Sequence, residues 1–293
     1  MIFWKEDSPT VLTRPPYLLF DIGGTKIRMA VSLDGKNLEN PVVVGTPRDF
    51  NQGMQVFAET AKKIIGQNTI NFVTGGMAGS MDGSKAQIFN SPHLPDWSGK
   101  NIKKAIGEAI RAPVLVENDA AMVGLGEAMF GAGKGFRIVV YITLSTGVNG
   151  SRIIDGKLDR SSYGFEIGHQ IINFDAGVTG GDWGRGELED YVSGAAINQR
   201  FGKLPEEIED ESVWENVTKY LAYGIHNVVV YWSPEVIVLG GGVSKRISLE
   251  RLLNYSDEIL TIFPSVPILK KATLGEMGGL YGALFYIQNF GLN

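Results

Sequence analysis

Residues 17–34, YLLFDIGGTKIRMAVSLD, combine an acid, a glycine turn and two cations in a pattern that suits phosphate binding. Apolar residues before the turn and alternating apolar residues after it predict a β-hairpin with an acid near its tip. Glycine N–H groups can come close to an oxyanion, and hydroxyl and cationic side chains add further donors. The residues concerned are Asp21, Gly23, Gly24, Thr25, Lys26 and Arg28. A Gly-Gly-Thr turn in an ordinary hairpin is the alternative interpretation.

A second group of polar side chains, Glu117, Asn118 and Asp119, follows the predicted strand 113–116 and precedes the predicted helix 120–129. The positive end of a helix attracts anions, so a junction of this kind can bind a ligand. Asn118 or Asp119 could instead do no more than cap the helix.

The opening pattern recurs later in the chain. The predicted strand 139–144 runs into the polar turn STGVNGS at 145–151, and the following strand ends on DGK at 155–157, as the first hairpin ends on DGK at 34–36. Two such units predict a duplicated fold, in which two phosphate-binding turns face each other across a cleft between related domains. Chance is the alternative, because Asp-Gly is a common hairpin turn.

Glycine-rich loops are also predicted at the ends of two buried strands. One covers 75–80 after strand 70–74, and the other covers 240–242 after strand 236–239. Open α/β sheets bind ligands at such strand ends, so both loops are candidates for a ligand site.

The alternating segment 164–172 predicts a strand that contains Glu166 and His169. A histidine by itself is more often structural than catalytic. We keep the structural interpretation for the other two histidines, His93 and His226.

The composition indicates a soluble globular protein of about two domains, with 293 residues of which 44% are hydrophobic. The net charge of −5 argues against a surface for nucleic acids or anionic membranes, so any phosphate site must be local. The absence of cysteine excludes disulfides, thiolate metal sites and thiol catalysis. No apolar run has the length of a membrane span, and we expect a cytoplasmic protein.

The ordered motifs closely resemble those of the ROK family of sugar kinases and repressors. They are DIGGTKIR, the loop before SPHLPDW, ENDAAMVGLGE, TLSTGVNG, FEIGH, Glu189 four residues before Ser193-Gly194, and VIVLGGGVS. That family includes bacterial glucokinases, fructokinases and N-acetylhexosamine kinases. The resemblance implies an α/β fold of two RNase-H-like domains, as in actin and hexokinase, with ATP and sugar in the cleft between them. It implies an N-terminal extension at 1–16, a small domain at 17–119 completed by helix 277–293, and a large domain at 120–276.

The resemblance also implies roles for individual residues. Asp119 would be the general base that accepts the proton of the sugar hydroxyl, and Asp21 would hold Mg2+ through water. The residues implied to contact the sugar are Gly76, Gly79, Asn118, Asp119, Glu166, His169 and Glu189. Those implied to contact ATP are Asp21, Gly23, Gly24, Thr25, Lys26, Ser145, Thr146, Gly147, Gly150, Gly240, Gly241 and Gly242.

The chain departs from the family pattern at the family's zinc module. Cysteines would stand at positions 180, 182 and 187, where this chain has Gly180, Asp182 and Glu187. We therefore expect no zinc, and His169 would have no metal to bind.

The expected activity is ATP- and Mg2+-dependent phosphorylation of a hexose by a homodimeric enzyme. Glucose is the first acceptor to test, with N-acetylated hexoses, mannose and fructose as alternatives, since His93 and Ala121 each replace an asparagine common in the family.

A sugar-sensing repressor is a second class of function. Family repressors carry an N-terminal helix-turn-helix domain, and we predict none in the first sixteen residues, which include three prolines. A non-catalytic sugar-binding protein of the same fold is a third class, against which Asp119 argues.

Overall fold

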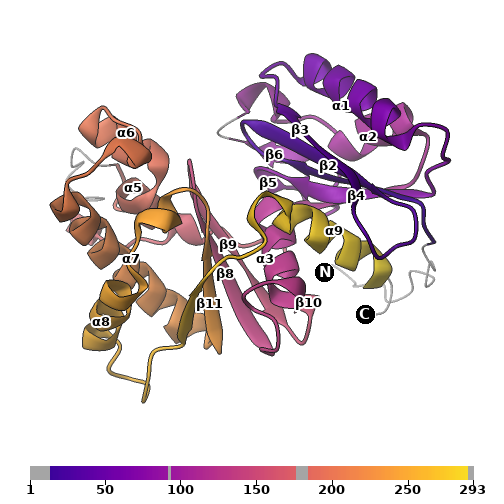
Figure 1. The fold of residues 1–293 in the computed structure, drawn as a ribbon. Coiled ribbons are helices and arrows are strands. Elements are labelled where there is room, and N and C mark those ends of the chain that lie inside the picture. Colours follow the sequence, from indigo (N-terminus) through magenta and orange to yellow (C-terminus); the bar gives the residue numbers. More distant parts are fainter. Residues whose placement is uncertain (1–13, 92–93, 176–183, 290–293) are drawn as a thin grey trace, which may run out of the picture. The chain divides into compact units, whose positions relative to one another are not determined.

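The computed structural model describes residues 14–91, 94–175 and 184–289. The chain divides into two compact units, which we call unit 1 (Met1–Gly126 with Gly275–Asn293) and unit 2 (Glu127–Leu274). Each contains its own five-stranded sheet (Figure 1). The first division falls inside helix α3 (Asp119–Phe130), whereas the sequence led us to expect a domain boundary after residue 119.

The sheet of unit 1 has the strand order β3-β2-β1-β4-β7. Its first three strands are antiparallel, and β1, β4 and β7 are parallel. The predicted hairpin is confirmed, because Tyr17 pairs with Ser32 and Ile22 pairs with Ile27. The strands are β1 (Tyr17–Ile22), β2 (Lys26–Ser32), β3 (Glu39–Gly45), β4 (Phe72–Met77) and β7 (Val114–Asn118), and a separate pair is formed by β5 (Ser80–Met81) and β6 (Ile88–Asn90).

Helices cover both faces of this sheet, because side chains along β1 alternate between two cores. Leu18, Phe20 and Ile22 belong to a core shared with α1 and α2, and the ring of Phe20 meets that of Phe57 edge to face at 5.6 Å. Tyr17 and Leu19 belong to a second core, shared with α9. The helices are α1 (Phe50–Ile65), α2 (Ile102–Ile110) and α9 (Gly278–Asn289), and single 3-10 turns are η1 (Pro95–Trp97) and η5 (Gly275–Met277).

The sheet of unit 2 repeats the same topology in the order β10-β9-β8-β11-β12. The two DGK turns occupy equivalent places, after β2 and after β9, and both of their glycines, Gly35 and Gly156, have a left-handed backbone. This equivalence confirms the predicted duplication. The strands are β8 (Ile138–Leu144), β9 (Val148–Ile154), β10 (Lys157–Leu158), β11 (Val236–Gly240) and β12 (Ile268–Lys271).

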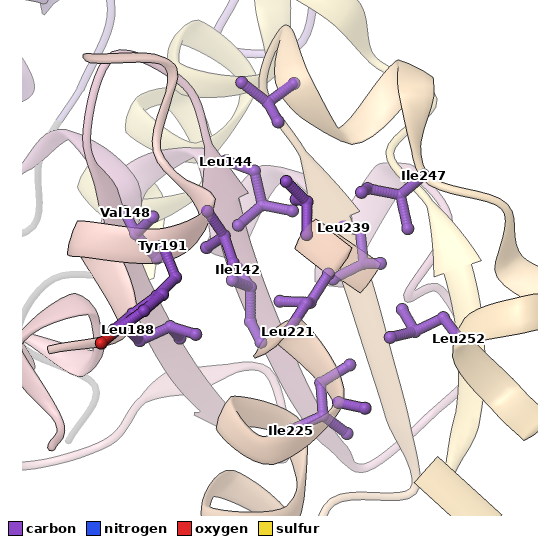
Figure 2. Close-up of a cluster of buried hydrophobic side chains, with 14 of the residues drawn as sticks. Ile142, Leu144, Val148, Leu188, Tyr191, Leu221, Ile225, Leu239, Ile247 and Leu252 are labelled. Atoms are coloured by element: carbon purple, nitrogen blue, oxygen red, sulfur yellow. The ribbon is translucent and has the colours of Figure 1, made fainter. Parts of the chain in front are cut away.

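One face of the second sheet packs against helices to form the largest buried cluster of unit 2. Figure 2 shows Ile142 of β8 and Leu239 of β11 meeting Leu221 of α7 and Leu252 of α8. The helices are α5 (Leu188–Val192), α6 (Gly194–Phe201), α7 (Glu211–Trp232) and α8 (Leu249–Ile259), with 3-10 turns η2 (Ile167–His169), η3 (Pro205–Glu207) and η4 (Val243–Arg246). Within the described ranges, no helix combines the length and the apolar character that crossing a membrane requires.

Two local predictions are wrong. The glycines predicted to form a loop after residue 74 begin inside β4. Gly75 is a glycine for a packing reason, because a Cβ there would lie 2.0 Å from the carbonyl oxygen of Phe20 in the neighbouring strand. The segment 164–172 contains the 3-10 turn η2 instead of a strand. Gly168 there lies against β9, where an added Cβ would be 2.1 Å from the carbonyl oxygen of Val148.

Glu127 is a buried carboxylate at the points where the chain passes between the two units. Its side chain is 1% exposed. It accepts hydrogen bonds from the N–H groups of Ala132 (2.9 Å), Thr273 (2.9 Å) and Leu274 (2.8 Å). Through these hydrogen bonds Glu127 joins the end of α3 to the segment that leaves unit 2.

Within unit 1, α3 and α9 cross with their backbones in contact. A Cβ on Gly282 would lie 1.7 Å from the carbonyl oxygen of Met122, and one on Gly126 would lie 2.2 Å from that of Gly278. Neither carbonyl can turn aside without breaking its helix, so the crossing requires glycine.

We expect Gly282→Ala to destabilise the protein by about 3 kcal/mol or more, because the methyl group has no space and the backbone must separate. The measurement is urea or thermal unfolding followed by circular dichroism. Gly45→Ala is the matched control, because nothing lies within 4 Å of a Cβ at that position. Equal unfolding midpoints for the two variants would contradict the close crossing.

Candidate active site

The carboxyl ends of the parallel strands of unit 1 bring several predicted site residues together. Asp21 pairs with Gly76 across the sheet, and Gly76 pairs with Glu117. Beyond Asp21 the hairpin turn is closed by the N–H of Gly23, which donates to the carbonyl of Lys26 at 2.9 Å. A Cβ on Gly23 would make only ordinary van der Waals contacts. The packing around this position therefore does not require a glycine.

Asp21 is buried and interacts with one cation, Arg28, and with two further acids, Asp119 and Glu276. Arg28 Nη1 donates to Asp21 Oδ2 at 3.2 Å, and Arg28 Nη2 lies 3.7 Å from Glu276, which also pairs with Lys26 at 2.5 Å. Burial raises the pKa of Asp21 to about 7, repulsion from Asp119 adds to the rise, and Arg28 opposes it. The two predicted site acids of unit 1, Asp21 and Asp119, therefore interact electrostatically.

Asn118 and Asp119 form the junction between β7 and α3. Asn118 Oδ1 accepts the N–H of Ala121 at 3.2 Å, and Asn118 Nδ2 donates to the carbonyl of Gly79 at 3.2 Å. A Cβ on Gly76 would lie 2.8 Å from Asp119 Cα, so the glycine allows β4 to approach the start of the helix. The structure thus brings Gly76, Gly79, Asn118 and Asp119 together and gives the capping role to Asn118.

Behind this junction, Glu117 fixes the end of β7. Its Oε1 accepts from Lys85 Nζ at 2.7 Å and from the N–H of Asn118 at 2.8 Å. The contact with Lys85, which lies between β5 and β6, depends on the folded hairpin and was not predicted from the sequence.

In unit 2, the turn after β8 occupies the place that the Gly-Gly-Thr turn has in unit 1. The carbonyls of Ser145 and Thr146 accept the N–H groups of Gly194 (2.7 Å) and Ala195 (3.0 Å) at the start of α6. Val148 N–H donates to Glu189 Oε2 at 2.6 Å, so the turn is also tied to α5.

The predicted nucleotide glycines of unit 2 differ in their surroundings. Gly241 has a left-handed backbone, and its Cβ would lie 2.2 Å from the carbonyl oxygen of Leu144, directly before the Ser145 turn. Gly242 has nothing within 4 Å of a Cβ position. Gly150 lies within β9, where a Cβ would be 2.5 Å from the carbonyl oxygen of Tyr141, so sheet packing already accounts for that glycine.

Lys271 and Ser244 stabilise the loop that contains Gly241 through hydrogen bonds to backbone carbonyl groups. Ser244 Oγ donates to the carbonyl of Gly241 at 2.8 Å, and Lys271 Nζ donates to the carbonyls of Ser244 and Ile247. Burial lowers the pKa of Lys271 to about 8. The loop is therefore fixed by hydrogen bonds within unit 2.

His169 lies among three carboxylates. Its Nδ1 is 2.6 Å from Glu187 Oε2. Burial opposes protonation of the ring, but the hydrogen bond to Glu187 and attraction from Glu187, Glu189 and Glu166 raise the pKa of His169 above its ordinary value. The sequence predicted that His169 lies with Glu166 and Glu189 but did not predict its contact with Glu187. In the sequence Glu187 is distinguished only by standing where the family pattern has a cysteine.

A model of the ROK family matches residues 17–289, which include both sheets and every residue described above. This chain belongs to the ROK family.

The relatives of this ROK protein include sugar kinases. The glucokinase of Streptomyces coelicolor is 29% identical over 76% of this chain and 81% of its own length. The N-acetyl-D-glucosamine kinase of Escherichia coli is 29% identical over 92% of this chain and 98% of its own length. A solved ROK glucokinase from Streptomyces griseus, in complex with glucose and AMPPNP, has a TM-score of 0.76 and 26% identity, and the match covers 92% of this chain and 98% of that one. The actin/hexokinase-like α/β fold expected from the sequence is confirmed.

Of the three positions where ROK zinc cysteines were expected, only Glu187 is described; Gly180, Asp182 and also His93 lie outside the described residues. Across 14–91, 94–175 and 184–289, no group of three or more His, Cys, Asp or Glu side chains is arranged to hold a metal ion. At position 187 the side chain is a carboxylate bonded to His169.

We expect metal analysis of this ROK protein to find no stoichiometric zinc, because the chain has no cysteine and Glu187 occupies the Nδ1 side of His169. Treatment with EDTA, without nucleotide, should change the melting temperature by less than about 1 °C, since a structural zinc would contribute folding free energy. Stoichiometric zinc whose removal lowers the melting temperature would contradict this expectation.

Proposed function

We propose that this ROK protein transfers the γ-phosphoryl group of ATP to a hydroxyl of a hexose, with Asp119 as the general base. The observation that carries the proposal is the β7–α3 junction, where Asn118 caps the helix through Oδ1 and Gly76 allows close approach to Asp119. Asp119 Oδ1 accepts the N–H of Ala120 at 2.8 Å, while the cap position is held by Asn118, and a carboxylate at the start of a helix can accept a proton from a substrate. The glucokinase and N-acetyl-D-glucosamine kinase relatives support the same class of reaction.

In the proposed reaction, Asp119 accepts a hydrogen bond from the sugar hydroxyl and then its proton as the oxygen attacks the γ-phosphorus. Asn118, Glu166, His169 and Glu189 hold the other hydroxyls. Amide, carboxylate and imidazole groups suit this role because a hydroxyl both donates and accepts, and an unpaired polar group would penalise the wrong sugar.

In the proposed complex with ATP, the turns 23–26 and 145–150 contact the phosphates. The loop 240–242 contacts the adenosine. The open space beside Gly242 fits a ligand that approaches the backbone, and at Gly23 a Cβ would meet only the carbonyl oxygen of Lys26 at 3.5 Å. A buried carboxylate paired with Arg28 fits a water-mediated contact to Mg2+ better than a direct one, so Asp21 is the proposed anchor. When bound, Mg2+ supplies neutralisation of phosphate charge.

The acceptor sugar is tested with a coupled ADP-release assay over glucose, mannose, fructose and N-acetylated hexoses. We expect turnover of at least one hexose, with glucose first. We expect little ADP release without sugar, because no acceptor hydroxyl is then aligned for attack on the γ-phosphorus. Binding of a hexose without turnover would favour a sugar sensor of the same family. No turnover of any hexose would overturn the kinase proposal.

Asp119→Asn should lower kcat by about 10²-fold or more, because the amide keeps the size of the side chain but cannot accept the proton. Sugar affinity and melting temperature should change little. The measurement is steady-state kinetics at saturating ATP.

Asp49→Asn is the matched control, since Asp49 Oδ1 accepts the N–H of Gln52 at 2.8 Å and caps α1 in the same unit. It should leave kcat unchanged. If Asp119→Asn turns over sugar within a few-fold of the wild type, Asp119 is not the base, and Glu166 and Glu189 are the next carboxylates to test.

A further inference from the structure

The His169 and Glu187 side chains form a pair that joins two segments of unit 2. The atoms in contact are Nδ1 of the imidazole and Oε2 of the carboxylate, 2.6 Å apart. The Glu187 side chain is 16% exposed, and that of His169 is 50% exposed. The carboxylate is therefore a shielded partner, while part of the ring faces solvent.

Backbone hydrogen bonds hold both partners in place. The N–H of Ile172 donates to the carbonyl of Gly186 at 2.9 Å, and the N–H of Leu188 donates to the carbonyl of Gln170 at 2.9 Å. Asp190 Oδ2 accepts the N–H of Glu187 at 3.0 Å, which fixes the entry to α5. Because these bonds lie on both sides of the pair, the two segments that carry it are held together, and the Nδ1–Oε2 contact orients the ring.

The bond through Nδ1 decides what the other ring nitrogen can do. In the imidazolium form Nδ1–H donates to Glu187 and Nε2–H is a second donor; in the neutral form with the same bond, Nε2 is only an acceptor. In the part of the chain that the structure describes, the side-chain hydrogen bond of the ring is the one through Nδ1, so Nε2 is the atom that we assign to a ligand. Attraction from Glu187 and Glu189 on α5 and from Glu166 before η2 favours the charged form.

The neighbouring glutamate has a different task. Glu189 Oε2 accepts the N–H of Val148 at 2.6 Å and so supports the turn after β8. Glu187 is the carboxylate that contacts the ring.

We propose that Glu187 is a positioning residue for sugar recognition: it holds His169 through Nδ1 so that Nε2–H is presented as a donor to a sugar hydroxyl. A hydrogen bond to one ring nitrogen commonly fixes the orientation of a histidine that binds a ligand through its other nitrogen. Here the Glu187 carboxylate makes that bond, at a position where the family pattern has a cysteine. The proposal rests on the proposed function, because it takes a hexose as the ligand.

The first test is a double-mutant cycle with Glu187→Gln, His169→Asn and the double variant. Glu187→Gln should raise the sugar KM about tenfold, with kcat within a few-fold and the ATP KM unchanged, because a charged hydrogen bond to the sugar is weakened. The double variant should match His169→Asn, since Glu187 acts through the ring. Additive effects on the sugar KM would overturn the proposal.

Asp210→Asn is the matched control for the loss of a carboxylate in unit 2. Asp210 Oδ1 accepts the N–H of Ser212 at 2.9 Å and caps α7, outside the proposed site. This variant should leave the sugar KM within about twofold of the wild type, because an exposed cap contributes only to stability.

The second test needs no turnover. The protein has three histidines, so the imidazole signals in nitrogen-15 NMR can be followed singly, with His169 assigned by its loss in His169→Asn. We expect His169 to titrate above the ordinary histidine range and Glu187→Gln to lower its pKa, so that the variant loses the Nε2–H donor, and sugar affinity, as pH rises through neutrality. A His169 signal that Glu187→Gln leaves unchanged would overturn the proposal.

The two proposals fail in distinguishable ways. A wild-type protein that phosphorylates a hexose but gives an additive cycle retains the proposed function and loses the role of Glu187. A wild-type protein that neither phosphorylates nor binds any hexose by calorimetry loses both the proposed function and the sugar contact of Nε2.

Discussion

Backbone contact at glycines sets the geometry of unit 1. Gly282 lies against Met122 at the crossing of α9 and α3, and a Cβ on Gly279 would lie 2.9 Å from Asp21 Cγ. Helix α3 begins at Asp119, so the same crossing that packs the two helices also sets how close Asp119 comes to Asp21. The electrostatic coupling of these two acids therefore depends on residues that have no functional group of their own.

The two units balance charge in opposite ways. In unit 1 a cation, Arg28, compensates buried acid at Asp21 and lies near Glu276. In unit 2 acids surround a single imidazole, and the closest of them is Glu187. In the first arrangement burial and the neighbouring acids disfavour negative charge on Asp21 despite Arg28, and in the second the acids favour the charged form of the imidazole.

Periodicity predicted the first hairpin, because a continuous apolar run indicates a strand with two buried faces and alternating apolar residues indicate a strand with one. The repeated DGK turns indicated the duplication. The failures at Gly75 and Gly168 have one cause: each glycine is required by a neighbouring strand that is distant in sequence. The partner of His169 could not be predicted for the same reason, since Glu187 meets the ring only after the segment 167–173 pairs with the start of α5.

Helix α9 affects the order in which the two units can fold during synthesis, because unit 1 needs this late segment and unit 2 does not. Unit 2 is one continuous stretch of chain, whereas unit 1 takes its last helix from the final part of the sequence. Leu280, Leu284 and Ile287 of that helix cover Tyr17 and Leu19, residues made near the beginning. During synthesis unit 2 can therefore close before α9 has been made, and the part of β1 that α9 covers is buried only when that helix docks.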